Sequence, residues 1–296
     1  MKRKNFNLDF VGIGAEKAGT TWLAECLNDH PEIYVPNQKE IFFFNEYDPH
    51  YLKVKNYRYS KGLSWYKHQF DGSGNVLKGE FSPTYLYDEK AAKRIAKDFP
   101  DTKIIVIFRE PVSRAFSQFI HDKRIGLIKD VSFEEAISQQ DNYIKKGYYF
   151  THLKRYYKLF KPENILTLIY EDIKKNPLAI VRKTYKFLGV KKINFRPKHL
   201  YMRSNTAGEA RLPLFNYFMM QTDYFLRKKR LDFLLKAFDT LGVRRFAMYI
   251  RDLNTLKLKK YPEVGGDVKQ QLRKKYVSDI HKLEKLLKRN LSFWYK

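Results

Sequence analysis

The chain is poor in cysteine and has no long apolar stretch. Cys26 is the only cysteine, so no disulfide can form within the chain, and we expect it to work in a reducing compartment, the cytoplasm. No run of about 18 apolar residues occurs, which argues against a transmembrane helix. The first residues, Met1–Lys4, are basic but lead into polar sequence, so we expect no signal peptide.

Metal-binding patterns are also missing. The sequence has 7 histidines, and no two of them share a helical i, i+4 spacing with a glutamate between them. Because cysteine is nearly absent as well, we predict no metal site. His121 is expected on the surface of a helix.

Internal repeats and low-complexity linkers are absent, and the composition predicts one globular domain. Hydrophobic residues make up 44% and aromatic residues 16% of the 296 positions. This content is sufficient for a core and too high for a disordered chain. We therefore expect residues 1–296 to form a single domain.

Acidic residues are outnumbered by basic ones. The chain has 58 Lys and Arg against 32 Asp and Glu, a formal net charge of +26. Most of this excess lies between residues 181 and 296, where there are 29 Lys and Arg and 9 Asp and Glu. The excess favours an anionic partner such as nucleic acid, anionic lipid, an acidic glycan or a phosphorylated nucleotide, although a lysine-rich solvated surface has the same composition.

Apolar runs and helix signals alternate along the first two thirds of the chain. Phe10–Gly14 has the pattern of a short buried strand, and Thr20–Leu27 has that of a helix. Lys103–Phe108 is almost continuously apolar and predicts a strand buried on both faces, with a helix beginning at Pro111. The same signals predict a helix opened by the capping box Ser132–Glu135, a strand at Ile165–Tyr170, and a helix at Pro177–Leu188 closed by Gly189. This alternation predicts an α/β fold with three layers and a central parallel sheet.

Residues from about 210 to 255 differ from the rest of the chain. They are helical in pattern, basic and aromatic, with no strand pattern, so we expect a helical insertion packed beside the sheet. Between residues 214 and 250, Phe and Leu alternate with Arg and Lys at amphipathic spacing. This pattern is compatible with peripheral contact of a membrane, which for a cytoplasmic protein is the inner face.

The strongest motif connects the first predicted strand to the first predicted helix. Residues 14–22 read Gly-Ala-Glu-Lys-Ala-Gly-Thr-Thr-Trp. Glycines allow a tight turn, and the free N–H groups at the start of a helix bind anions, so we expect a phosphate here. A Walker A loop places its lysine directly after the second glycine, whereas Lys17 lies two residues before Gly19. This spacing argues against an ordinary ATPase or GTPase.

A second anion-binding pattern follows the predicted strand at 103–108. Arg109 comes directly after the strand, and Ser117 lies two turns into the helix that follows. Ligands of parallel α/β sheets bind at the carboxyl ends of the strands. Together with the first motif, this pattern predicts a second anion site at the same edge of the sheet.

These two patterns resemble the motifs of sulfotransferases that use 3′-phosphoadenosine 5′-phosphosulfate (PAPS). In that family the 5′-phosphosulfate loop reads Lys-x-Gly-Thr-Thr-Trp and the 3′-phosphate motif has Arg and Ser eight positions apart, and both match here without gaps. The chain is most similar to the sulfotransferase domain of heparan sulfate N- and O-sulfotransferases. Six further segments carry that similarity: Lys39–Asn45, Lys61–Tyr66, Glu80–Tyr85, Tyr149–His152, Lys186–Gly189 and Lys260–Pro262.

The resemblance implies a P-loop-like fold and a role for each matched residue. Arg109 and Ser117 would hold the 3′-phosphate of PAPS. Trp22 matches a residue that stacks on adenine, and it is equally suited to the protein core. The resemblance assigns the 5′-phosphosulfate to Lys17, Ala18, Gly19, Thr20 and Thr21.

A third group of cofactor-binding residues is implied near the end of the insertion. Lys257, Lys259 and Lys260 precede Tyr261 and Pro262, where related enzymes close a basic loop over the 3′-phosphate. The match is partial. The heparan enzymes carry a cysteine pair before this loop, whereas this chain has none and carries the helical insertion instead.

The implied reaction moves a sulfuryl group from PAPS to a hydroxyl or amine and leaves 3′,5′-phosphoadenosine (PAP). By resemblance, Lys17 neutralises the charge on the departing PAP. A general base must accept the proton of the acceptor. Glu40 matches the catalytic glutamate of the heparan enzymes, and Glu80, which follows the strand-like Val76–Gly79, is the alternative. Either glutamate could instead form an ion pair or a helix cap.

The resemblance also implies the acceptor, a glycan or glycolipid, and the basic surplus suits an anionic one. Two other functions remain as alternatives. A nucleic-acid-binding protein would account for the charge, and its binding would fall steeply with salt and need no PAPS. A small-molecule P-loop kinase would need Mg²⁺ and a γ-phosphate, and the position of Lys17 argues against it. We expect no nucleic-acid partner.

Overall fold

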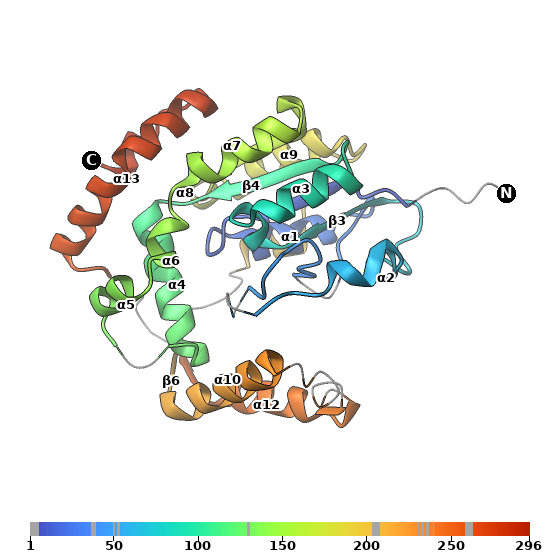
Figure 1. The fold of residues 1–296 in the computed structure, drawn as a ribbon. Coiled ribbons are helices and arrows are strands. Elements are labelled where there is room, and N and C mark those ends of the chain that lie inside the picture. Colours follow the sequence, from blue (N-terminus) through green and yellow to red (C-terminus); the bar gives the residue numbers. More distant parts are fainter. Residues whose placement is uncertain are drawn as a thin grey trace.

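A computed structural model of the chain has a five-stranded parallel sheet at its centre (Figure 1). The structure describes residues 6–36, 40–49, 51, 54–128, 131–202, 208–229, 231, 234, 237–238, 240–257 and 263–296. The strands lie in the order β2 (Ile33–Tyr34), β3 (Leu77–Phe81), β1 (Phe10–Gly14), β4 (Lys103–Phe108) and β5 (Ile165–Ile169). The strands predicted at 10–14 and 103–108 are confirmed. Each has a neighbouring strand on both sides, and almost all of its side chains are buried.

Large and small residues alternate between β1 and β3. Phe10 pairs with Gly79, and Gly12 pairs with Phe81. A Cβ atom on Gly79 would lie 2.3 Å from the Phe10 ring, and one on Gly12 would lie 1.9 Å from the Phe81 ring. Each glycine therefore leaves the space that the opposite phenylalanine fills, which fixes the register of these two strands.

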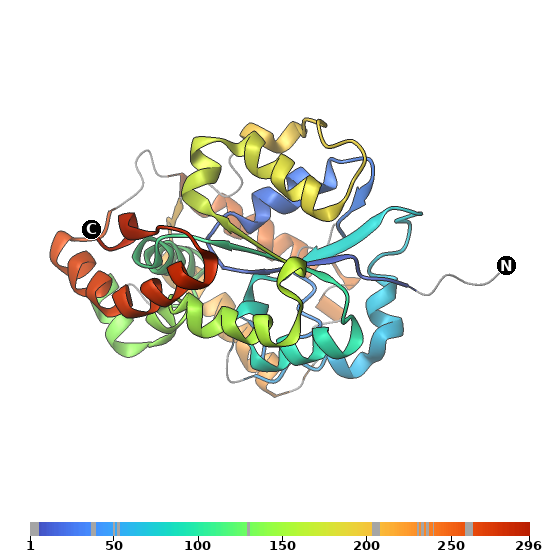
Figure 2. The same cartoon turned by 90° about the horizontal axis from the view of Figure 1, so that it is seen from above.

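Helices cover both faces of the sheet, so the predicted three-layer α/β fold is confirmed (Figure 2). One face carries α1 (Thr20–Asn28) and α9 (Pro177–Leu188), and the other carries α3 (Glu89–Asp98) and α7 (Tyr149–Leu159). Gly189 ends α9 in the left-handed conformation, as its position in the sequence predicts. Four shorter helices complete this part of the chain: α2 (Gly62–His68), α5 (Phe133–Gln139), α6 (Asn142–Lys145) and α8 (Tyr170–Lys175).

Two long helices lie at the carboxyl edge of the sheet. Helix α4 (Pro111–Ile125) begins directly after β4, where the Glu110 side chain accepts hydrogen bonds from the N–H groups of the first turn. Helix α13 (Gly266–Leu287) packs against α4 and α7. Its buried Asp279 accepts hydrogen bonds from the backbone N–H groups of Phe150 and Thr151, so it fixes the start of α7.

The described residues between 208 and 257 form a helical arm that extends from α4 (Figure 1). The antiparallel strands β6 (Gly208–Ala210) and β7 (Thr255–Lys257) bracket it, and between them lie α10 (Pro213–Lys228) and α12 (Val243–Leu253). The two helices agree with the predicted helical segment, and the strand pair at its borders was not predicted. We propose that residues 1–296 form one domain with a helical insertion at about 210–255.

The arm is attached through a close backbone contact with the end of α4. Gly126 ends that helix with a φ of 80°, and a Cβ atom on it would lie 2.2 Å from the carbonyl carbon of Asn216. The Asn216 side chain donates a hydrogen bond to the Arg124 carbonyl oxygen (2.7 Å). The arm therefore docks on α4 instead of on the sheet.

Candidate active site

The glycine-containing loop between β1 and α1 forms the centre of the site. Lys17 and Gly19 both have left-handed backbone conformations, with φ values of 64° and 91°. A side chain on Gly19 would meet the Tyr170 ring at 3.2 Å. No side chain caps the N-terminus of α1, so the N–H groups of its first turn are left for an anion. Thr20 is buried and Thr21 is half-buried in this turn.

Arg109 joins this loop to the second predicted motif. Its guanidinium donates a hydrogen bond to the main-chain oxygen of Lys17 (3.0 Å) and lies 4.9 Å from the centre of the Tyr170 ring. The Tyr149 hydroxyl donates to the Arg109 carbonyl oxygen (2.8 Å), which fixes the backbone where β4 ends. Ser117 is half-buried two turns into α4. The structure thus brings Lys17 and Arg109 together at the edge where the sequence placed them.

Lys17 lies in a shell of charged side chains. Burial first, and then repulsion from the Arg124 guanidinium, lower the pKa of Lys17 from 10.5 to about 8. The carboxylates of Asp122, Glu16 and Glu40 act on its pKa in the opposite direction. Lys17 is therefore mostly protonated at neutral pH but poorly solvated, and an anion bound beside it would stabilise its charge. The predicted base Glu40 lies within electrostatic reach of this ammonium group.

Glu40 occupies a loop that is held by side chains from several elements. Its φ is 62° and that of Phe42 is 51°, both unusual for residues other than glycine. The N–H of Phe42 donates to Ser82 Oγ (3.0 Å), and the N–H of Phe44 donates to the Tyr85 hydroxyl (3.3 Å). These bonds hold the backbone that carries Glu40.

Glu80 lies beneath this loop and anchors the same hydroxyl groups. It is 1% exposed, and its carboxylate accepts hydrogen bonds from Tyr66 (2.7 Å), Tyr85 (3.0 Å) and Ser82 (2.7 Å). Burial raises the pKa of Glu80, and these hydrogen bonds oppose that shift. The sequence placed Glu80 after its strand, whereas β3 continues to Phe81, so the carboxylate points into the core from within the strand.

The remaining predicted cofactor residues occupy different surroundings. Ala18 is buried in the loop. Trp22 is 8% exposed, and its indole N–H donates to the Leu200 carbonyl oxygen (3.1 Å), so it packs between α1 and the segment at 198–201. Only the backbone of Lys257 is described, at the end of β7. Lys259, Lys260, Tyr261, Pro262 and Lys39 lie outside the described residues.

Several charged residues near Lys17 were not predicted as part of the site. Glu16 forms an ion pair with Lys146. Burial raises the pKa of Asp122 to about 6, and this carboxylate accepts hydrogen bonds from Tyr143 (2.8 Å) and Gln118 (2.6 Å). The sequence could have indicated Arg124, which also acts on Lys17, because residues 117, 121 and 124 share one face of the helix.

His121 lies on that helix face and is half-buried. Its Nδ1 atom lies 3.2 Å from a guanidinium nitrogen of Arg124. In the described part of the chain, no group of three His, Cys, Asp or Glu side chains is arranged to hold a metal ion.

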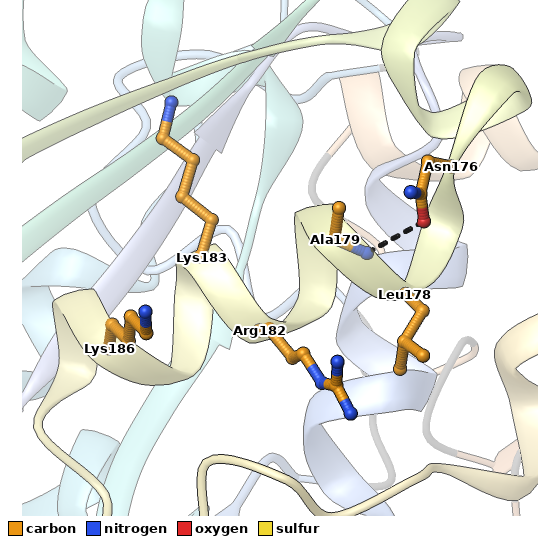
Figure 3. Close-up of a pocket in the computed structure, with 6 residues that line it drawn as sticks. All are labelled: Asn176, Leu178, Ala179, Arg182, Lys183 and Lys186. Atoms are coloured by element: carbon orange, nitrogen blue, oxygen red, sulfur yellow. Dashed lines mark hydrogen bonds between the residues drawn. The ribbon is translucent and has the colours of Figure 1, made fainter.

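A surface pocket on α9 is separate from this site. It is lined by Asn176, Leu178, Ala179, Arg182, Lys183 and Lys186, none of which is a predicted site residue. Figure 3 shows the Lys183 and Arg182 side chains extending in different directions from the helix, so they do not converge on one ligand position. The loop around Lys17 is therefore the candidate active site.

Comparison with known proteins identifies a family and a fold. The family model described as a sulfotransferase domain matches residues 8–228. Human bifunctional heparan sulfate N-deacetylase/N-sulfotransferase 3 is 31% identical over 202 residues, which cover 61% of this chain and 22% of that protein. Mouse heparan sulfate glucosamine 3-O-sulfotransferase 6 is 29% identical over 203 residues, covering 65% of this chain and 55% of that protein. The chain thus spans between about a fifth and about half of these relatives.

A solved structure shares the whole fold. The crystal structure of a sulfotransferase from Alicyclobacillus acidocaldarius has a TM-score of 0.70 and 24% sequence identity to this chain. The match covers 98% of this chain and 100% of the other, so it includes most of the arm.

Proposed function

Because the match over residues 8–228 shows that this chain belongs to the sulfotransferase domain family, we propose that it transfers a sulfuryl group from PAPS to a hydroxyl or amine of a glycan. Family membership confirms the resemblance to sulfotransferases found in the sequence, and it supports PAPS as the donor. It leaves the nucleic-acid-binding protein and the small-molecule kinase without support. The observation that carries the proposed chemistry is the contact of Arg109 with the loop of Lys17, with Glu40 close by.

The residues at this edge of the sheet fit the donor. When bound, PAPS supplies the sulfuryl group and leaves as PAP. The uncapped first turn of α1, with Thr20 and Thr21, offers N–H and hydroxyl donors to its 5′-phosphosulfate. Arg109 and Ser117 are the residues we assign to the 3′-phosphate. Lys17 would offset the negative charge that develops on the departing PAP.

Glu40 is the residue we assign as general base. It lies on a half-buried loop within electrostatic reach of Lys17, where an acceptor would meet the sulfuryl group. Glu80 is fully engaged with three hydroxyl groups beneath that loop. We therefore assign Glu80 to positioning the Glu40 loop instead of to proton transfer.

The acceptor class rests on similarity and charge. The names of the relatives given above describe them as heparan sulfate sulfotransferases, and this chain is about 30% identical to them. The excess of basic residues after residue 181 suits an anionic glycan or glycolipid. The expected cytoplasmic location remains part of this proposal.

The decisive experiment offers the purified chain PAPS with a radiolabelled sulfuryl group and a panel of acceptors. The panel contains anionic glycans, neutral N-acetylglucosamine oligomers, glycolipids and small alcohols, and each labelled product is identified. We expect label in a glycan or glycolipid without added metal. Label only in small alcohols would overturn the glycan acceptor. Thermal stabilisation by ATP with Mg²⁺ but not by PAP would overturn the sulfotransferase activity itself.

A further inference from the structure

Helix α10 of the arm exposes a stripe of large apolar side chains. Leu214 is 71% exposed and Phe218 is 66% exposed, and Phe225 is exposed as well. Their spacings of four and seven residues place the three side chains within about 40° of one another around the helix. The three side chains therefore lie along one face of the helix, with Gln221 between Phe218 and Phe225.

The opposite side of α10 is bonded to the body of the protein. The Tyr51 hydroxyl donates to the Met220 carbonyl oxygen (3.0 Å), and Arg227 forms an ion pair with Asp48 (3.4 Å). Asn216, also on this side, is fully buried against the end of α4. The apolar stripe consequently faces away from the protein body and does not line the candidate active site.

Helix α12 adds a second exposed apolar face to the arm. Phe246, Tyr249 and Leu253 are all more than half exposed, at spacings of three and four residues. The end of α12 lies beside the start of α10, because the Asn254 side chain bonds to Leu212 and to Asn216. Exposed apolar surface on this scale marks an interaction site in a soluble domain.

The charges around the stripe indicate which partner covers it. The only acidic residue of α10 is Asp223, which pairs with Arg227 (2.6 Å) on the side that faces the protein body. Lys228 and Lys229 are exposed at the end of the stripe, and Arg211 is exposed just before its start. An apolar face bordered by cations matches a surface that combines hydrocarbon with negative charge, as anionic lipids do. A second copy of the chain would instead bring like charges together.

We propose that the helical arm docks on an anionic membrane surface, with Leu214, Phe218 and Phe225 inserted among the lipids and Lys228 and Lys229 at the head groups. The contact is peripheral. None of the helices in the described ranges is long and apolar enough to cross a bilayer. The proposal is independent of the acceptor, since it concerns a face that points away from the active site.

Sedimentation with lipid vesicles tests this docking. The full chain is mixed with vesicles of phosphatidylcholine alone or of phosphatidylcholine with phosphatidylglycerol. We expect binding to the second kind, and we expect that binding to fall as salt rises. The double substitution Phe218→Ser and Phe225→Ser should weaken binding by about tenfold or more, because two apolar anchors are lost. Lys228→Glu with Lys229→Glu should abolish the preference for phosphatidylglycerol.

A matched control keeps the result interpretable. Leu159→Ser removes an exposed apolar side chain from α7, far from the arm in the fold, and should leave vesicle binding unchanged. Unchanged melting temperature and PAP binding in each variant show that folding is intact. Equal vesicle binding by the wild type and the double serine variant would overturn the proposal. So would sedimentation velocity that shows a dimer without lipid, dissociated by the same two serines, because the stripe would then bind a second copy.

Discussion

The Arg109 guanidinium donates a hydrogen bond to the main-chain oxygen of Lys17, at 3.0 Å. This one contact joins the two predicted anion-binding motifs, whose residues are 92 positions apart in the sequence. It also gives the carbonyl oxygen of Lys17, a residue with a left-handed backbone conformation, a charged partner. The 5′-phosphosulfate and the 3′-phosphate of the donor would therefore be bound by residues that are hydrogen-bonded to each other.

Arg109→Ala should discriminate between nucleotides with and without a 3′-phosphate. Loss of a charge-assisted bond to that phosphate should weaken PAP by about tenfold to a hundredfold. Adenosine 5′-phosphate, which lacks the group, should be weakened much less, through the lost support of Lys17 alone. Titration calorimetry with both ligands measures the difference. Equal losses would assign Arg109 to the fold instead of to the 3′-phosphate.

Glu40→Gln should separate proton transfer from binding. Glutamine keeps the size of the side chain but cannot accept the acceptor's proton, so kcat should fall by about two to four orders of magnitude. PAP affinity and melting temperature should stay close to those of the wild type. Glu80→Gln is the comparison, and it should retain substantial turnover. A large loss of kcat in Glu80→Gln with near-normal turnover in Glu40→Gln would reverse the two roles.

Ser82→Ala should disturb the Glu40 loop, and Tyr66→Phe provides its matched control. Both hydroxyls donate to the Glu80 carboxylate at 2.7 Å, so each substitution should cost about 1–3 kcal/mol of unfolding free energy. Only Ser82 also accepts the N–H of Phe42 in the loop. We therefore expect kcat to fall further in Ser82→Ala, and its unfolding free energy to fall somewhat more, because the buried N–H of Phe42 loses its acceptor. Similar kcat values in the two variants would show that this amide bond does not position Glu40.

The lowered pKa of Lys17 predicts a pH effect on nucleotide binding. Lys17 is cationic below its pKa of about 8 and loses its charge as the pH rises through that value, so PAP affinity should decline there. A bound anion restores the charge, and calorimetry at pH 8 in buffers of different ionisation enthalpy should detect proton uptake. Lys17→Arg should abolish that uptake, because arginine stays protonated. Proton uptake that persists in Lys17→Arg would assign it to another group.

Gly126→Ala should loosen the arm, and Gly72→Ala tests the backbone contribution alone. Both glycines have a φ of 80°, so alanine should cost about 1 kcal/mol at either position. At Gly72 no atom lies within 4 Å of an added Cβ, whereas at Gly126 the backbone of Asn216 is only 2.2 Å away. We expect trypsin to cut the arm faster in Gly126→Ala only. Equal cleavage rates in both variants would contradict the close docking of arm and helix.

Local patterns predicted much of the fold and the centre of the site. The strands at 10–14 and 103–108 were predicted with their observed ends, because buried parallel strands form unbroken apolar runs. That both motifs lie at the carboxyl edge of the sheet was also predicted, whereas the pairing of β1 with β4, which brings Lys17 and Arg109 together, was not. Helix α13 was not predicted, and neither was its use of Asp279 to fix α7 across more than a hundred residues. Such features depend on partners distant in the sequence, which no local pattern contains.

The position of Glu80 illustrates the same limit. Its place near a strand was predicted, but the sequence could not show that three hydroxyl groups would occupy its carboxylate. Ser82 directly follows β3, Tyr85 lies in the turn after it, and Tyr66 comes from α2. The distinction between a buried positioning residue and a candidate base therefore required the assembled structure.

The paired strands at the base of the arm make it a modular part of the chain. Ala210 and Thr255 are partners in the β6–β7 ladder, so the arm leaves and rejoins the protein at neighbouring points. The 44 residues between them could be replaced by a two-residue hairpin turn such as Asn-Gly without stretching the backbone. Insertions of different length and chemistry are equally compatible with this junction. The surface that we propose for membrane docking can thus change in evolution or by design while the strand ends that hold Lys17 and Arg109 stay as they are.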